Sequence, residues 1–117
     1  MLSKIFQFIA ALILLSAPAF AQDWQKLNGE EISIALTSRT LQYPDAKQDF
    51  FEDGRTLYEV RQPSWGRWRV IENQYCSIWP PSDAWVCYDL ERHKFGLQLR
   101  FVSRNGGTTI GKYIDLD

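Results

Sequence analysis

The stretch that decides the fold reads Tyr75-Cys76-Ser77-Ile78-Trp79-Pro80-Pro81-Ser82-Asp83-Ala84-Trp85-Val86-Cys87-Tyr88. Its two ends are rich in strand-forming residues. The segment between them, 80–83, must be a turn or loop because proline cannot join a sheet ladder. Folding the stretch about this loop brings Cys76 opposite Cys87 and Ile78 opposite Trp85. The sequence therefore predicts a β-hairpin closed by one disulfide.

The first 21 residues have the features of a secretory signal peptide. Lys4 supplies a positive charge, Ile5–Leu15 is an apolar run, and Ala19-Phe20-Ala21 is a small-x-small cleavage site. The apolar run is too short for an ordinary transmembrane span, and an uncleaved N-terminal anchor is the alternative. We expect a mature domain of residues 22–117 in the periplasm or outside the cell, with no stable membrane span.

The two cysteines have more than one possible role. Cysteines in a small exported chain usually pair. A redox pair or a metal site is the alternative, but the spacing of Cys76 and Cys87 is not Cys-x-x-Cys, and the single histidine cannot complete a zinc set. We therefore expect a structural disulfide between them.

The mature chain has 96 residues, which is enough for one small domain. It carries 12 Lys and Arg against 14 Asp and Glu once Lys4 is removed with the signal peptide. A nucleic-acid or anionic-membrane binder would need an excess of positive charge. We therefore expect no nucleic-acid partner.

One helix is predicted, near the start of the mature domain. Asn28 is a good N-cap, Glu31 stands three residues later as in a capping box, and Leu27 can pack against Ile32. The helix should end near residue 37 or 38, where the apolar residues stop recurring at helical spacing.

From Arg39 onward the apolar residues alternate with a period of two, which is typical of strands. Asp53-Gly54 is a hairpin turn signal, and residues 62–66 form a break. An all-β domain is therefore predicted, in which an antiparallel meander closes into a small barrel or folds into a sandwich. The eight expected strands are 40–43, 48–51, 56–60, 67–72, the two hairpin strands from 75 and to about 90, 95–101 and 108–114.

The clearest alternation lies in the strand expected at 95–101. Phe95, Leu97, Leu99 and Phe101 should face inward, with Gln98 and Arg100 outward. Trp68 and Tyr88 are also expected in the core. Glu91–Lys94 should be a polar connection that leaves His93 in a solvated loop.

Several motifs together resemble a family of short exported proteins common in alphaproteobacteria. The specific part is the block from Tyr75 to Tyr88, and the resemblance covers nearly all of the mature chain. It implies a periplasmic location and a disulfide, and it implies no chemistry because the family's function is unknown. The other matching motifs are Leu27-Asn28-Gly29-x-Glu31-Ile32, Gly54-Arg55-Thr56-Leu57-Tyr58 and Gly66-Arg67-Trp68-Arg69-Val70.

The sequence offers no convincing catalytic or metal site. His93 is the only histidine, so a zinc or copper site is not expected, and no spacing places it beside a serine nucleophile. No Gly-x-Gly-x-x-Gly follows a strand, so a dinucleotide site is not expected either. We predict no catalytic residue, no metal and no cofactor.

Aromatic and arginine side chains are the candidates for binding. Trp65, Trp79 and Trp85 lie near predicted turns, where they can contact a partner or instead plug the barrel. Arg67 and Arg69 share one strand face and can bind an anion, or they can belong to an ordinary polar surface. Other arginines on or beside strands that can contribute are Arg55, Arg61 and Arg100.

We therefore predict a periplasmic non-enzymatic binding module for an unknown protein partner, such as an inhibitor or an envelope-associated factor. A carrier with a small ligand inside the barrel is the alternative. Bulky inward residues should fill the interior of so small a barrel, which disfavours it. An enzyme is the third hypothesis.

Overall fold

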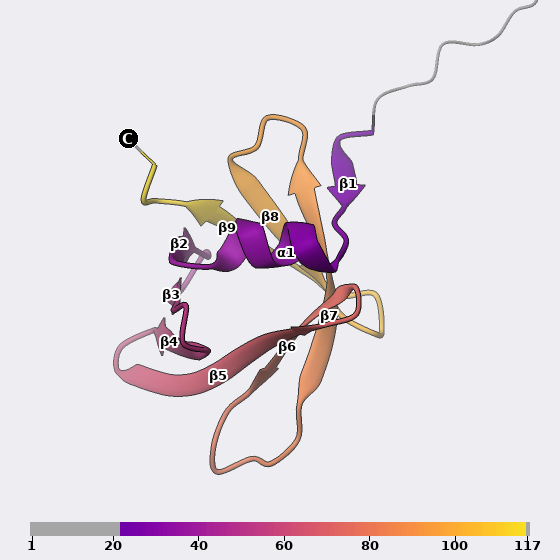
Figure 1. Ribbon diagram of the computed structural model, residues 1–117. Coiled ribbons are helices and arrows are strands. Elements are labelled where there is room, and N and C mark those ends of the chain that lie inside the picture. The colour runs from indigo at the N-terminus through magenta and orange to yellow at the C-terminus, as the bar shows by residue number, and fades with distance from the viewer. Residues whose placement is uncertain (1–21, 117) are drawn as a thin grey trace, which may run out of the picture.

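The computed structural model describes residues 22–116 of the chain. These residues form one helix and nine strands (Figure 1). In chain order the elements are β1 (Trp24–Lys26), α1 (Gly29–Leu36), β2 (Arg39–Gln42), β3 (Lys47–Phe50), β4 (Arg55–Glu59), β5 (Pro63–Ile71), β6 (Gln74–Ile78), β7 (Val86–His93), β8 (Gln98–Val102) and β9 (Thr108–Tyr113).

Strands β2 to β9 form a closed antiparallel barrel. Each strand pairs with the next along the chain, and β9 pairs back with β2 through Leu41↔Tyr113 and Gln42↔Lys112. Strand β1 is outside this ring and pairs with the end of β7. The predicted meander barrel is confirmed, and closure rules out the sandwich.

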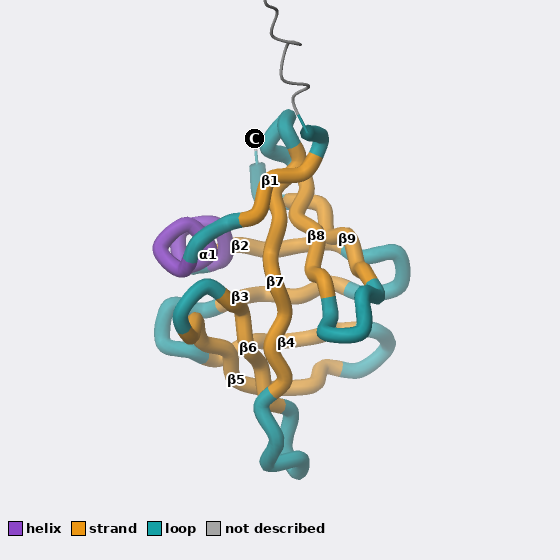
Figure 2. Tube along the Cα trace, turned by 90° about the vertical axis from the view of Figure 1, so that its right-hand side faces the viewer, coloured by secondary structure: helices purple, strands orange, loops and turns teal. Residues whose placement is uncertain are grey.

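Helix α1 closes one end of the barrel. Asn28 is its N-cap and forms a capping box with Glu31, as predicted. The apolar face of the helix buries Ile32, Ala35 and Leu36, and the helix contacts β2, β5 and β6. Figure 1 shows it crossing in front of the ring of strands, and in Figure 2 it lies to one side of the barrel.

The N-terminus of α1 is attached to the β5–β6 turn. The backbone N–H of Gly29 donates a hydrogen bond to Oδ1 of Asn73 at 2.8 Å. A Cβ on Gly29 would collide with the carbonyl oxygen of Glu72, so only glycine permits this close approach. The helix is thereby positioned over the barrel end.

The barrel interior has an apolar half and a polar half. The half next to α1 is filled by apolar side chains that are almost completely buried. At the other end the inward positions carry tyrosines, Gln48 and Ser77. The residues that fill the apolar half are Leu41, Phe50, Trp68, Leu90 and Leu99, together with Leu27, Ile32 and Leu36.

On the N-terminal side of the hairpin, strands β1 and β5 differ from the prediction. Strand β1 was not predicted, because its three residues have no alternation. Strand β5 begins at Pro63 and not at Arg67. Proline is tolerated there because it is the first residue of the strand, and Gly66 lies within the strand because the ring of Trp79 packs against its backbone.

The region after Leu90 also differs from the prediction. Strand β7 continues to His93, since Glu91, Arg92 and His93 pair with β1. His93 is therefore half-buried in a strand and not in a solvated loop. Phe95 and Leu97 are 72% and 55% exposed, because they lie in the connection before β8 begins at Gln98.

The other residues predicted in the core are buried or half-buried. Trp68, Leu99 and Phe101 are buried as predicted, and Tyr88 is half-buried.

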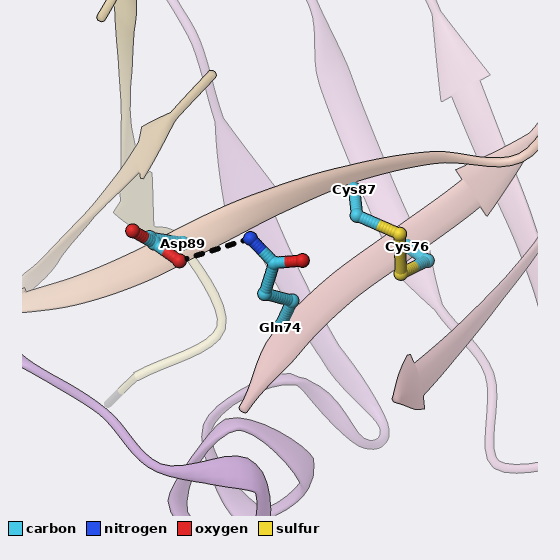
Figure 3. Close-up of a disulfide and its surroundings, with 4 residues drawn as sticks. All are labelled: Gln74, Cys76, Cys87 and Asp89. Atoms are coloured by element: carbon cyan, nitrogen blue, oxygen red, sulfur yellow. Dashed lines mark hydrogen bonds between the residues drawn. A yellow bond between two sulfur atoms is a disulfide. The ribbon is translucent and has the colours of Figure 1, made fainter. Parts of the chain in front are cut away.

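The disulfide joins Cys76 of β6 to Cys87 of β7, which are direct cross-strand partners (Figure 3). Cys76 is fully buried. Further along the same pair of strands, Nε2 of Gln74 donates to Oδ1 of Asp89 at 3.1 Å. The ladder ends at the next pair, Ser77↔Val86, so the expected pairing of Ile78 with Trp85 does not form. The hairpin register is otherwise as predicted.

Replacing both cysteines with alanine should lower the free energy of unfolding by about 2–5 kcal/mol. The bond closes a loop between residues 11 positions apart, and without it the unfolded chain gains conformational freedom. Urea unfolding of wild type and the double variant measures the change. An identical transition midpoint in both proteins would contradict a structural role.

Candidate ligand-binding cavity

A cavity of about 410 Å³ opens at the barrel end opposite α1. Every barrel strand contributes at least one residue to its lining, either from the strand or from the position directly after it. The lining residues are Tyr43, Gln48, Tyr58, Ser64, Tyr75, Ser77, Trp79, Tyr88, Phe101 and Thr109.

The floor of the cavity is a hydrogen-bonded network centred on Gln48. Its Oε1 accepts a hydrogen bond from the Tyr43 hydroxyl at 2.7 Å. Its Nε2 donates to Oγ1 of Thr56 at 2.9 Å and to the Tyr75 hydroxyl at 3.3 Å. Because Gln48 and Thr56 are buried, these bonds spare both groups the cost of an unsatisfied polar atom.

Aromatic rings form the walls. The ring of Tyr58 lies 5.8 Å from that of Trp79 in an edge-on arrangement and 6.0 Å from that of Tyr43. Tyr75 meets Phe101 at 5.2 Å. Aromatic walls of this kind offer a ligand a large apolar contact area.

Trp79 is held at the cavity by two neighbours. Its Nε1 donates to Oγ of Ser77 at 3.3 Å. Its ring occupies space that a side chain on residue 66 would need, since a Cβ on Gly66 would lie 2.5 Å from Cε3 of the indole. Gly66 therefore allows the indole to pack against the barrel wall.

The cavity carries no charge near neutral pH. None of its lining residues is Asp, Glu, Lys, Arg or His. Burial raises the pKa of the Tyr75 hydroxyl to about 12 and that of Tyr43 well above its usual value. A charged ligand would lose hydration here without gaining an opposite charge, which is costly.

The predicted interaction residues lie on two different surfaces. Trp79 lines the cavity. Trp65, Arg67 and Arg69 point outward from β5, and Trp85 packs beside them with the Arg69 guanidinium 3.8 Å from its ring centre. The structure thus brings four of the five together on the outer face and separates Trp79 from them.

Most of the cavity residues were not predicted from the sequence. Gln48, Tyr58 and Tyr75 stand at inward positions of their strands, and Tyr43 directly follows β2. The sequence signal that could have revealed the polar end of the barrel was Gln48 at an inward position, because a buried amide needs hydrogen-bonding partners.

The residues considered for catalysis do not form a site. Ser64 and Ser77 line the cavity, but His93 does not. It lies near the opposite end of β7, with its ring 5.0 Å from that of Trp24. Among the described residues, no group of three or more His, Cys, Asp or Glu side chains is placed to hold a metal ion.

Comparison of the chain with known protein families, with curated proteins and with solved structures found no match. No helix in the described part of the chain has the length and apolar content needed to cross a membrane.

The raised tyrosine pKa values predict that the protein loses stability in alkali. Below pH 10 both the folded and unfolded states hold the Tyr75 proton. Between pH 10 and the folded pKa of about 12, the unfolded state releases it first, so the free energy of unfolding falls.

Urea unfolding at pH 8, 10 and 11 should show this fall, and Tyr75→Phe should make it less steep. Burial also raises the pKa values of Tyr43 and Tyr113. These two tyrosines should still contribute to the fall in the free energy of unfolding in the variant. The same slope in wild type and Tyr75→Phe would contradict the assignment.

Proposed function

We propose that the protein is an exported, non-enzymatic binding protein that holds a small uncharged ligand with at least one ring in the barrel cavity. The observation that carries this proposal is the lining of the cavity, which combines aromatic walls and a hydroxyl-rich floor with no charged side chain. The alternative of a ligand carrier is thereby favoured over a module that acts only through its surface loops.

The size of the cavity supports a small ligand. About 410 Å³ lies within the usual range for small-molecule sites, and it suits a ligand of up to three aromatic rings. The expectation that bulky inward residues would fill the barrel is wrong for this end. Gly66 and Gly111 lie at inward positions, and side chains there would collide with the rings of Trp79 and Tyr43, respectively.

The side chains suggest how such a ligand is held. The rings of Tyr58 and Trp79 pack against a flat apolar face, and the hydroxyls of Tyr75 and Ser77 reach hydrogen-bonding groups on the ligand. Gln48 already uses both N–H groups within the protein, so the floor is preorganised and does not have to rearrange on binding.

Two features support an exported binding role. The Cys76–Cys87 disulfide suits an oxidising compartment such as the periplasm, in agreement with the signal peptide expected at residues 1–21. The cavity has no side chain that titrates near neutral pH and could transfer a proton during a reaction. The first feature favours export, and the second favours binding over catalysis.

The charge preference is testable with two fluorescent probes that differ by one sulfonate group. N-phenyl-1-naphthylamine is neutral, and 1-anilinonaphthalene-8-sulfonate is its anionic counterpart. The neutral probe should bind saturably with one site per chain, and the anionic probe should compete for that site at least about tenfold more weakly, because the cavity offers it no counter-charge.

Neighbouring threonines on β9 provide a matched pair of variants. Thr109 lines the cavity and Thr108 does not, so Thr109→Phe should abolish binding of the neutral probe and Thr108→Phe should leave it unchanged. Equal affinity for the two probes, or equal effects of the two variants, would overturn the proposal.

A further inference from the structure

The outer face of strands β4 and β5 carries a second cluster, which we call the Arg–Trp face. It consists of Arg55, Trp65, Arg67 and Arg69 of these strands, together with Trp85 of the loop before β7. The inward side chains of the same strands, such as Thr56 and Trp68, are buried, so the alternation of the strands directs the cluster to the outside. No lysine belongs to it.

The arginines on this face occupy neighbouring positions on the two strands. Arg55 and Arg67 are direct cross-strand partners, and like charges in this position destabilise a sheet. Arg69 follows two residues later on the same face. This arrangement has a structural cost, and an anion bound between the guanidinium groups would offset it.

Protein carboxylates compensate only part of this charge. Asp53 forms an ion pair with Arg55 at 2.8 Å, and hydrogen bonds from the Arg55 backbone and guanidinium hold the pKa of Asp53 below its usual range, with the Arg67 charge adding to this. Among the described residues, Arg67 and Arg69 form no ion pair. Two other acids are engaged elsewhere, since Glu59 pairs with Lys47 and Asp89 with Lys26.

Aromatic rings flank the arginines. Trp65 is 49% exposed, and its ring lies 5.8 Å from that of Phe51 and 5.1 Å from the Arg55 guanidinium. The Arg69 guanidinium stacks over Trp85 at 3.8 Å. Such stacking fixes a guanidinium by its face and leaves its N–H edges available to an anion.

We propose that the Arg–Trp face binds an anionic glycan. Guanidinium groups suit the carboxylate, sulfate or phosphate substituents of such a polymer, and the C–H face of a sugar ring packs on an exposed indole such as Trp65. Trp65 and the three arginines line neither the barrel cavity nor the wider hollow between Trp85 and the β8–β9 turn. This favours a polymer lying across an open surface over a protein anchored by a side chain in a pocket.

Dextran sulfate and uncharged dextran form a matched pair of probes. Wild-type protein should bind dextran sulfate and not dextran in isothermal titration at low salt. Arg67→Gln combined with Arg69→Gln should weaken binding at least tenfold. The control that removes the same charge away from the face, Lys94→Gln with Lys112→Gln, uses two residues that line neither hollow, and it should change affinity less than twofold.

Trp65→Ser and poly-L-glutamate distinguish a glycan from other acidic partners. Trp65→Ser should weaken binding of dextran sulfate severalfold, and poly-L-glutamate should bind less well than dextran sulfate. No binding of dextran sulfate would overturn the proposal. Equal binding of the two polymers without dependence on Trp65 would also overturn it, in favour of an acidic protein partner.

This proposal is independent of the cavity. Thr109→Phe, which blocks the cavity, should leave dextran sulfate binding unchanged.

Discussion

The two halves of the barrel depend on the hydrogen bonds that the side-chain amide of Gln48 makes. It links β3 to the Tyr43 hydroxyl just after β2, to Thr56 of β4 and to Tyr75 of β6. An eight-stranded barrel leaves an interior that side chains must fill. On one side of Gln48 apolar side chains, including those of α1, fill it, and on the other side it remains open. The amide can be buried at this boundary because its hydrogen bonds are made within the protein.

The alternation of side chains in the strands gives the molecule two unlike surfaces. Strand β5 directs Ser64 into the neutral cavity and Arg67 and Arg69 to the cationic outer face. The loop after β6 divides the tryptophans in the same way, because Gly66 leaves room for the indole of Trp79 on the barrel wall, whereas Trp85 packs against Arg69 outside. A neutral surface and a cationic surface thus share a few strands without sharing side chains.

Much of the fold could be predicted from local sequence signals. The capping box of Asn28, the turn at Asp53-Gly54 and the register of Cys76 with Cys87 depend on neighbouring residues, and the structure confirms each of them. Strand β1 and the extension of β7 to His93 exist because the two segments pair with each other, which no local pattern reveals. Phe95 and Leu97 follow the alternation of β8 but precede the point where pairing begins. The cavity was missed because it depends on where rings from separate strands meet.

The most direct test of an unfilled, uncharged barrel end is native mass spectrometry of the protein purified from a periplasm without denaturation. We expect a mature, oxidised chain with one retained small molecule, released on gentle activation as a neutral species. A chain that retains nothing, even after incubation with the periplasmic small-molecule extract, would contradict this expectation. Retention of only anionic species would contradict it equally.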